Sequence, residues 1–269
     1  MSDTCDLRVV FLGSGSGGNA VAVTDGDTTL LIDCGFSARE VARRMALAGL
    51  DAGSVDAILI THEHSDHLRG VEVFARRHGC EVLATTGTRR AAGLDAMDAC
   101  VVGIAAGSEV RVKTLTVLPF RVSHDAAEPV GFRVTARSGM CFGLATDTGV
   151  LTPEAAEGLA EVDLLGLESN HDLRMLEAGP YPGFLKRRIL SRDGHLSNPD
   201  AADALETLAS NRLKRVVAVH RSDTNNTASL ARRGLVARLA AIGLELPVDV
   251  APQCSPLDCQ PPQGTLLGG

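Results

Sequence analysis

The amino-acid sequence predicts an α/β protein with a four-layer αββα arrangement, in which two sheets pack together and helices cover their outer faces. Three observations support this prediction. Residues 8–34 contain three short apolar segments separated by turns, residues 109–146 alternate apolar and polar side chains, and residues 153–250 alternate helical with apolar strand segments. Strand-rich segments with helices between them in both halves are typical of sheets packed under outer helices.

The first half is expected to begin with strands at LRVVFLG, NAVAVTDG and TTLLIDCG, with Asp25 and Gly26 forming a hairpin turn. Ser37 is suited to N-cap a helix, AREVARRMALAG, that stops at Gly49. DAILIT is typical of a buried strand. A helix at VEVFARRHG, a strand at EVLAT and a short helix from Thr88 are expected to follow.

In the second half, helices are expected at PEAAEGLAE, PDAADALETLAS and SLARRGLVARLAAIG, and strands at VDLLGLES and KRVVAVH, with a long region containing LKRRIL between VDLLGLES and PDAADALETLAS. The segment from Pro252 onward is rich in Pro and Gly, so we expect it to be poorly ordered. The expected organisation is therefore one domain over residues 1–251 and a tail over residues 252–269.

Composition limits the class of protein. The net charge of −7 argues against a surface that coats nucleic acid generally. No apolar run approaches the ~18 residues of a membrane span, and the N-terminus has no basic region typical of a secretory signal. Seven scattered cysteines without a CxxC pair fit reduced thiols. We expect a cytoplasmic protein that has no membrane partner.

The glycine-rich stretch GSGSGG formally matches a dinucleotide-binding fingerprint. That fingerprint requires the glycines to open a helix whose N-terminus holds the pyrophosphate. Here the next residues, NAVAVTDG, have strand propensity. A tight turn that brings backbone close to a site is therefore the favoured interpretation.

The densest group of potential ligands is THEHSDH, residues 61–67. His62 and His64 point to the same side if the segment is extended, while Asp66 and His67 face a second point across a turn. Imidazoles and carboxylates suit zinc, manganese or iron, and a structural zinc site would more usually recruit Cys. One cation does not need so many ligands, so the cluster indicates two divalent metal ions. The competing interpretation is a His-rich polar loop.

Three further candidates stand at predicted strand ends. His124 would complete a trio with His62 and His64, and His220 would join Asp66 and His67. Asp147, before a Thr-Gly turn, is placed to bridge two cations. Asp125, Asp172 and Asp193 are competing carboxylates that spacing does not dismiss, and Asp33 is a candidate for orienting a ligating histidine.

With THEHSDH, His124, Asp147 and His220 in this order, the chain resembles the metallo-β-lactamase superfamily. More narrowly, it is similar to the WalJ/YycJ family of bacterial exonuclease-like members. The resemblance runs from about Arg8 to Asn226, and its most specific segment is ESNHDLRMLEAGPYPGFLKRRILSRDGHLSN. One departure is Arg221, where the family pattern suggests an apolar residue.

The resemblance also implies roles outside the ligand set. GHLSN is similar to the segment of nuclease members in which a histidine protonates the leaving oxygen, and His195 matches that histidine. Glu168 in ESN would then orient or charge His195. The alternative for His195 is a loop histidine next to a helix cap at Ser197 and Asn198. His171 and Asp172 stay open between support and catalysis.

The ligand set predicts a metal-dependent phosphodiesterase in which Asp66 is catalytic, and the resemblance implies that His195 and Glu168 are catalytic as well. The resemblance implies a 5'-to-3' exonuclease acting on DNA, with a homodimer as a further expectation. Positive charge near the site along the chain would serve nucleic acid, and it comes from Lys186, Arg187, Arg188, Arg192, Lys214 and Arg215. The alternatives are a small-molecule hydrolase of the same fold, acting on a cyclic phosphodiester, a thioester or a lactone, and a non-enzymatic metal-binding module.

Overall fold

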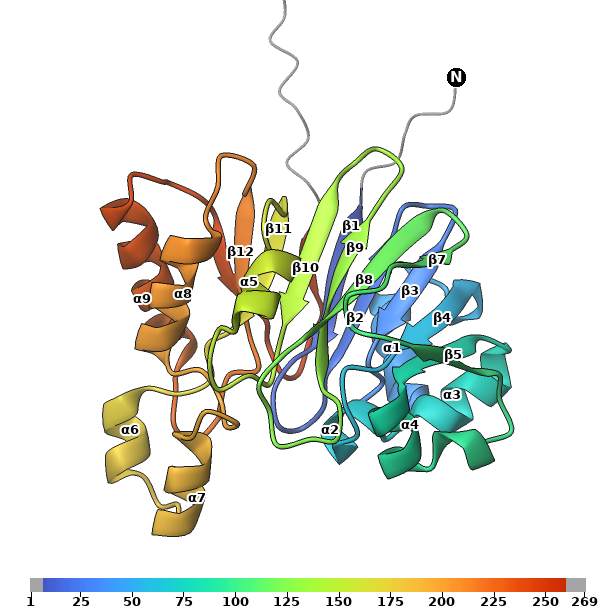
Figure 1. Cartoon of the computed structure of the whole chain (residues 1–269), viewed down its shortest axis with the longest axis horizontal. Coiled ribbons are helices and arrows are strands. Elements are labelled where there is room, and N and C mark those ends of the chain that lie inside the picture. The colour runs from blue at the N-terminus through green and yellow to red at the C-terminus, as the bar shows by residue number, and fades with distance from the viewer. Residues whose placement is uncertain (1–6, 260–269) are drawn as a thin grey trace, which may run out of the picture.

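The computed structural model describes residues 7–259 and contains two seven-stranded sheets (Figure 1). In spatial order, the first sheet contains β14 (Leu257–Cys259), β1 (Arg8–Gly13), β2 (Ala20–Thr24), β3 (Thr29–Ile32), β4 (Val55–Leu59), β5 (Glu81–Thr85) and β6 (Val101–Ile104). The second contains β13 (Val248–Val250), β12 (Arg215–Val219), β11 (Leu164–Glu168), β10 (Cys141–Ala145), β9 (Val130–Thr135), β8 (Leu115–Arg121) and β7 (Val110–Val112).

Helices flank both sheets. They are α1 (Ala38–Leu47), α2 (Ser65–Leu68), α3 (Val71–His78), α4 (Thr86–Ala92), α5 (Pro153–Gly158), α6 (Leu173–Ala178), α7 (Gly183–Ile189), α8 (Asn198–Leu208) and α9 (Ala228–Ala241), with 3₁₀ turns at Ala52–Ser54 and Leu94–Ala96. Within residues 7–259, no helix has the length and apolarity needed to cross a bilayer.

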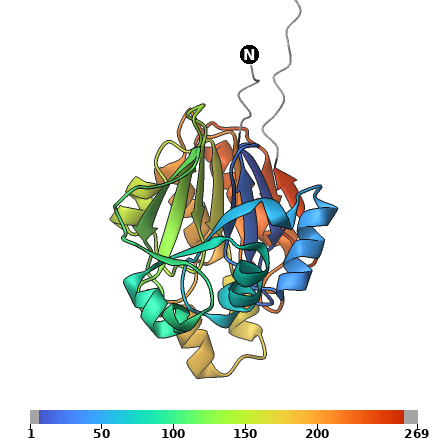
Figure 2. The ribbon, with the colours of Figure 1, turned by 90° about the vertical axis from the view of Figure 1, so that its right-hand side faces the viewer.

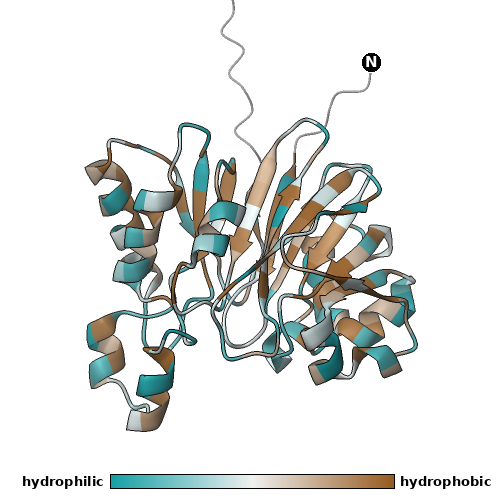
Figure 3. Ribbon diagram, viewed as in Figure 1, coloured by the Kyte–Doolittle hydropathy of each residue, from teal (hydrophilic) through white to brown (hydrophobic). Residues whose placement is uncertain are grey.

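Three apolar layers separate the four layers of secondary structure. Phe11, Phe132 and Phe142 lie in the layer between the two sheets, where Phe11 and Phe142 meet edge to face with ring centroids 5.9 Å apart. A second layer lies under α1 and α3, and a third under α5, α8 and α9. In Figure 3 the strands are mostly hydrophobic, whereas the outer helices alternate hydrophobic and hydrophilic turns. The predicted αββα arrangement is confirmed.

Local signals account for most element boundaries. The Ser37 hydroxyl accepts a hydrogen bond from Glu40 N and caps α1 as predicted, and Gly79, with φ of 70°, ends α3. The prediction that a helix starts at Thr88 is wrong by two residues. Thr85, the last residue of β5, is the N-cap of α4 and accepts from Thr88 N.

The predicted start of the tail at Pro252 is wrong for the residues that the structure describes. Leu257–Cys259 form β14, which pairs antiparallel with β1 at the edge of the first sheet. Cys259 is buried in the layer between the sheets, so this strand protects an edge that would otherwise be open. Residues 260–269, the rest of the predicted tail, lie outside the described residues.

The strand directions bring one end of both sheets together. β10, β11 and β12 are parallel neighbours, and β4 runs parallel to β3 and β5 in the other sheet. Their carboxyl ends meet at the lower edge in Figures 1 and 2, beside α2 and above the projecting α6 and α7. Loops at this edge carry the predicted site residues.

Candidate metal centre

Two groups of side chains lie at this edge. His62, His64 and His124 form the first, and Asp66, His67, Asp147 and His220 form the second. Within each group the potential ligand atoms all lie within 4.8 Å of one another. These seven residues come from four separate segments of the chain and are the seven that the sequence analysis predicted as metal ligands.

The first group is a ring of three imidazoles. The ring centroids of His64 and His124 lie 5.0 Å apart, and each lies within 5.0 Å of the His62 ring. His64 Nδ1 and His124 Nε2 approach to 3.3 Å. Three imidazole nitrogens that converge in this way match the three-histidine zinc sites of enzymes.

The second group places carboxylates against two imidazoles. His67 Nε2 lies 3.4 Å from Asp66 Oδ2 and 3.3 Å from Asp147 Oδ2, and His220 Nε2 lies 3.5 Å from Asp66 Oδ2. The other oxygen of Asp147, Oδ1, lies 3.8 Å from His124 Nε2 in the first group. Asp147 therefore faces both groups with different oxygens, as a bridging carboxylate would.

Each anchored imidazole has one ring nitrogen tied to the protein and the other turned inward. Nδ1 of His67 contacts Asp33 Oδ2 at 2.7 Å, Nδ1 of His124 contacts Gly194 O at 3.1 Å, and Nδ1 of His220 contacts Glu168 Oε1 at 2.9 Å. Outer contacts of this kind fix the tautomer of metal-ligating histidines.

Buried nitrogens without a partner provide a direct test of whether this set fits cations. Among the described residues, Nε2 of His62 and Nε2 of His220 are buried and have no hydrogen-bond partner, although a buried polar atom normally has one. Both belong to the inward-facing set, and the remaining donors are imidazole and carboxylate, which suit divalent cations. The side chains therefore fit divalent metal binding.

The electrostatics of the two groups differ. Burial lowers the pKa values of His62 and His124, which favours the neutral imidazole that binds metal. Burial opposes charge on His220 as well, but the Asp147, Asp66 and Glu168 carboxylates outweigh it and raise the pKa of His220 to about 10. Such a negative field favours a positive charge between these side chains.

The backbone is strained at three positions of the site. Asp33, Asp147 and His220 have φ values of 59°, 52° and 51°, in the left-handed region that residues other than glycine seldom adopt. Each follows the end of a strand, so this conformation turns the side chain sharply into the site. Strain of this kind persists where surrounding contacts hold it.

Sequence reasoning missed Asn19. Its side-chain amide lies 3.3 Å from Asp66 Oδ2 and 3.1 Å from His67 Nε2, and its backbone N–H donates to Asp66 O. The glycine stretch before it is a turn that leads into strand β2, as predicted, and Ser14 in this turn accepts a hydrogen bond from His220 N. The only sequence feature that could have indicated Asn19 was the glycine-rich turn before it. That turn was predicted to bring backbone close to a site, but it did not identify a side chain.

Gly35 packs closely against the backbone of Asp66, and replacing it tests whether this close approach positions Asp66. A Cβ atom at Gly35 would lie 1.6 Å from the carbonyl oxygen of Asp66, a backbone atom that cannot rotate away. Gly35→Ala is expected to destabilise the fold by about 1–3 kcal/mol and to weaken metal binding, because Asp66 must move. Thermal unfolding and metal content would measure both effects.

A glycine elsewhere is the matched control. In helix α9, a Cβ at Gly234 would meet only Asn198 O at 3.7 Å, an ordinary contact. Gly234→Ala is expected to stabilise the fold by up to about 1 kcal/mol through helix propensity. Equal behaviour of the two variants would contradict the close approach at Gly35.

Glu168 holds two histidines at once. Its Oε1 lies 2.8 Å from His195 Nδ1 and 2.9 Å from His220 Nδ1, while Thr148 N and Leu196 N donate to Oε2. A third group also brings one potential ligand atom per residue within 4.8 Å of the others, and it consists of Asp147, Glu168, His195 and His220. Glu168 is fully buried and already accepts from four donors, so its geometry favours orienting the histidines over ligating.

Removing the charge of Glu168 is expected to affect both histidines. Glu168→Gln keeps the shape but replaces one carboxylate oxygen with an NH₂ group that cannot accept a hydrogen bond. We expect metal affinity and turnover each to fall by about 10- to 100-fold, the usual cost of losing such a support. Competition with a chelating dye and steady-state kinetics would measure the two losses, and unchanged metal affinity would show that His220 does not depend on Glu168.

The competing carboxylates lie at the margin of the groups. Asp172 caps α6 by accepting from Met175 N, and Asp193 accepts from Ser123 Oγ. Asp125 is nearer, 3.4 Å from His124 Nε2, but it also pairs with Arg188 at 2.5 Å. Arg221, the departure from the family pattern, turns its guanidinium into its own loop and pairs with Asp223 at 2.5 Å.

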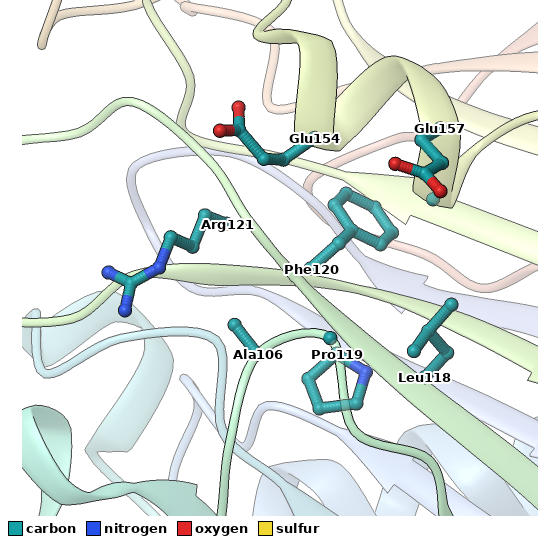
Figure 4. Close-up of a pocket in the computed structure, with 9 residues that line it drawn as sticks. Ala106, Leu118, Pro119, Phe120, Arg121, Glu154 and Glu157 are labelled. Atoms are coloured by element: carbon teal, nitrogen blue, oxygen red, sulfur yellow. The ribbon is translucent and has the colours of Figure 1, made fainter.

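A separate cavity of about 240 Å³ lies between β8 and α5. Figure 4 shows Arg121, Glu154 and Glu157 around an apolar wall that includes Phe120. None of its lining residues belongs to the two ligand groups. The cavity is therefore not part of the candidate metal centre.

Comparison with known proteins identifies the relatives of this chain. The family model described as "Beta-lactamase superfamily domain" matches residues 28–221. The exodeoxyribonuclease WalJ of Streptococcus pneumoniae strain D39 is 37% identical over 248 residues, which cover 90% of this chain and 92% of that protein. The exodeoxyribonuclease YycJ of Bacillus anthracis is 37% identical over 234 residues, covering 84% and 86%.

A solved structure supports the fold independently. The metallo-β-lactamase fold protein YhfI of Bacillus subtilis superposes with a TM-score of 0.72 at 14% identity, over 94% of this chain and all of that one. At this identity the likeness concerns the fold alone, whereas the two relatives share more than a third of their residues over most of both chains. The chain therefore belongs to the metallo-β-lactamase superfamily and, within it, to the WalJ/YycJ family.

Proposed function

We propose that the protein is a metal-dependent nuclease, a hydrolase of phosphodiesters that removes nucleotides from a 5' end of DNA. The observation that carries the proposal is His195 held by Glu168 beside both ligand groups. His195 Nδ1 contacts Glu168 Oε1 at 2.8 Å and lies 3.9 Å from Asp147 Oδ1. The names of the relatives support DNA as substrate and exonuclease as the activity.

The proposed roles follow from the geometry. His62, His64 and His124 would hold one cation, Asp66, His67 and His220 a second, and Asp147 would span both. Zinc and manganese suit this donor set best, and iron also fits. When bound, the cations supply Lewis acidity toward the phosphate oxygens and the attacking water.

The chain's own residues would move the protons. His195 uses Nδ1 for Glu168, so Nε2 is the ring nitrogen that can protonate a leaving oxygen. Asp66 would accept the proton of the water. The side chains of Asp66 and His195 are each 20% exposed, so both can meet a substrate, whereas Glu168 is sealed from solvent. A proton donor at this position favours a phosphodiester over a thioester, because a thiolate leaves without a proton.

The proposal extends to the surroundings of the enzyme. We place it in the cytoplasm as one folded unit whose substrate is DNA, and a homodimer stays a prediction that sedimentation would test. The relatives' names support a nucleic-acid substrate.

The test is a time course with 5'-end-labelled single-stranded DNA and manganese-loaded protein. Early release of a labelled mononucleotide or very short product is expected, with no release by Asp66→Ala or in the presence of a chelator. An untouched oligonucleotide, with metal shown to be bound, would contradict the proposal and point to a small cyclic or diester substrate.

A further inference from the structure

Helices α6 and α7 form a hairpin that projects from the site edge of the second sheet (Figures 1 and 2). It carries three of the six large hydrophobic side chains that are exposed within residues 7–259: Leu173, Phe184 and Leu190. Phe184 is 68% exposed, the largest fraction among the six. Single exposed apolar side chains are ordinary on protein surfaces, so the feature to explain is the occurrence of three of them on one short hairpin.

The hairpin is also strongly basic. Residues 173–192 contain five basic side chains and one acidic side chain, Glu177, in a chain of net charge −7. The basic residues are Arg174, Lys186, Arg187, Arg188 and Arg192. Among the described residues, no carboxylate forms an ion pair with Arg174, Lys186, Arg187 or Arg192, whereas Arg188 pairs with Asp125. This free positive charge favours a polyanionic partner.

The hairpin is tied directly to the site. Arg188 in α7 contacts Asp125, the neighbour of His124, and Ile189 O accepts a hydrogen bond from His195 N. The carbonyl oxygen of Gly194 accepts a hydrogen bond from His124 Nδ1. Phe184 and Ile189 are separated by about 7 Å along the helix axis. A polymer that lies along α7 would therefore lead into the site.

The other basic residues that the sequence placed near the site do not belong to this surface. Lys214 and Arg215 stand at the start of β12, and His220 follows its end, about 16 Å away for a strand of this length. Both are also paired, Lys214 with Asp163 and Arg215 with Asp249. That part of the sequence-based prediction is wrong, and the remaining basic residues all lie on or next to α7.

We infer that the α6–α7 hairpin is the arm that binds a single nucleic-acid strand outside the catalytic centre. Phe184 stacks on a base, and Arg187, which has no carboxylate partner among the described residues, contacts phosphates. An exposed ring beside unpaired cations is the combination by which proteins bind single strands without reading sequence. The inference rests on the proposed nuclease function and deepens it by assigning the surface that holds the strand.

Two substitutions test the arm, each with a matched control. Phe184→Ala removes the ring and Arg187→Glu reverses a charge. Leu47→Ala, on α1, removes a 64% exposed side chain, and Arg76→Glu, on α3, makes the same change of net charge on the other side of the molecule. Binding to a fluorescent oligodeoxythymidine is measured by anisotropy in a His195→Ala background, so that the strand is not consumed. Turnover is measured in the otherwise unchanged protein, with the oligonucleotide and with bis(p-nitrophenyl) phosphate.

Phe184→Ala is expected to raise the Kd for the oligonucleotide by at least about fivefold. Arg187→Glu is expected to raise it too and to reduce the slope of log K against log salt by about 0.7 for the lost phosphate contact. Turnover of bis(p-nitrophenyl) phosphate, which is too small to reach the arm, stays unchanged. The two control variants bind and cleave as the parent does.

The opposing outcomes separate the two proposals. If the parent cleaves oligonucleotides and the arm variants match their controls, the assignment of the hairpin as a nucleic-acid-binding arm is wrong and the nuclease proposal stands. If the parent cleaves bis(p-nitrophenyl) phosphate but neither binds nor cleaves oligonucleotides, both are wrong. If Phe184→Ala changes the sedimenting species and leaves the oligonucleotide Kd unchanged, the ring belongs to a protein interface and the arm is again wrong.

Discussion

Turnover of a phosphodiester is expected to fall by about two to four orders of magnitude in His195→Ala, with the metal content unchanged. The reason is that His195 lies outside both ligand groups while its Nδ1 is held by Glu168. Its loss removes a positioned proton donor and leaves every proposed ligand in place. Parallel metal analysis and steady-state kinetics on the same preparation would measure this separation.

The matched control for this variant is His78→Ala. His78 lies at the end of α3, next to Phe74, and belongs to neither group. It is expected to keep both metal and turnover. If His195→Ala cleaved at the parent rate, the proton-donor role would be wrong, and loss of metal in this variant would instead make His195 a ligand.

In Asp147→Asn, metal and activity are expected to be lost together. Asparagine tolerates the left-handed backbone at this position and keeps the side-chain shape, so the change removes little besides charge. Asp147 is the only side chain that faces both groups with different oxygens among the proposed ligands in residues 7–259. Metal affinity should fall by more than the roughly 10- to 100-fold that loss of an outer support costs. Elemental analysis after dialysis would measure it.

Asp193→Asn provides the comparison. Asp193 is a carboxylate close to the site in the fold, but it accepts a hydrogen bond from Ser123 Oγ and belongs to neither ligand group. It should retain metal and activity. Loss of metal by Asp193→Asn together with retention by Asp147→Asn would overturn the ligand assignment.

The residues chosen for these experiments could be identified from the sequence because each carries a local signal. His62, His64, Asp66 and His67 lie within six positions, so their spacing reports their shared location. His124, Asp147 and His220 each follow an apolar strand, and ends of neighbouring strands meet at one edge of a sheet. Hydrophobic periodicity also predicted most of the strands and helices behind them.

Contacts between distant segments were decided only by the tertiary structure. Asn19 meets Asp66 across 47 positions, Glu168 holds His195 and His220 from 27 and 52 positions away, and β14 closes an edge next to β1. Lys214 and His220 are close in sequence but stand at opposite ends of one strand. The sequence by itself determined the layers and the order of the proposed ligands along the chain, because spacing and periodicity are local. Only the packing of the sheets and of the α6–α7 hairpin decided which side chains orient the proposed ligands and where unpaired positive charge gathers. These contacts join residues that are far apart in the chain, and such contacts produce no periodic pattern in the sequence.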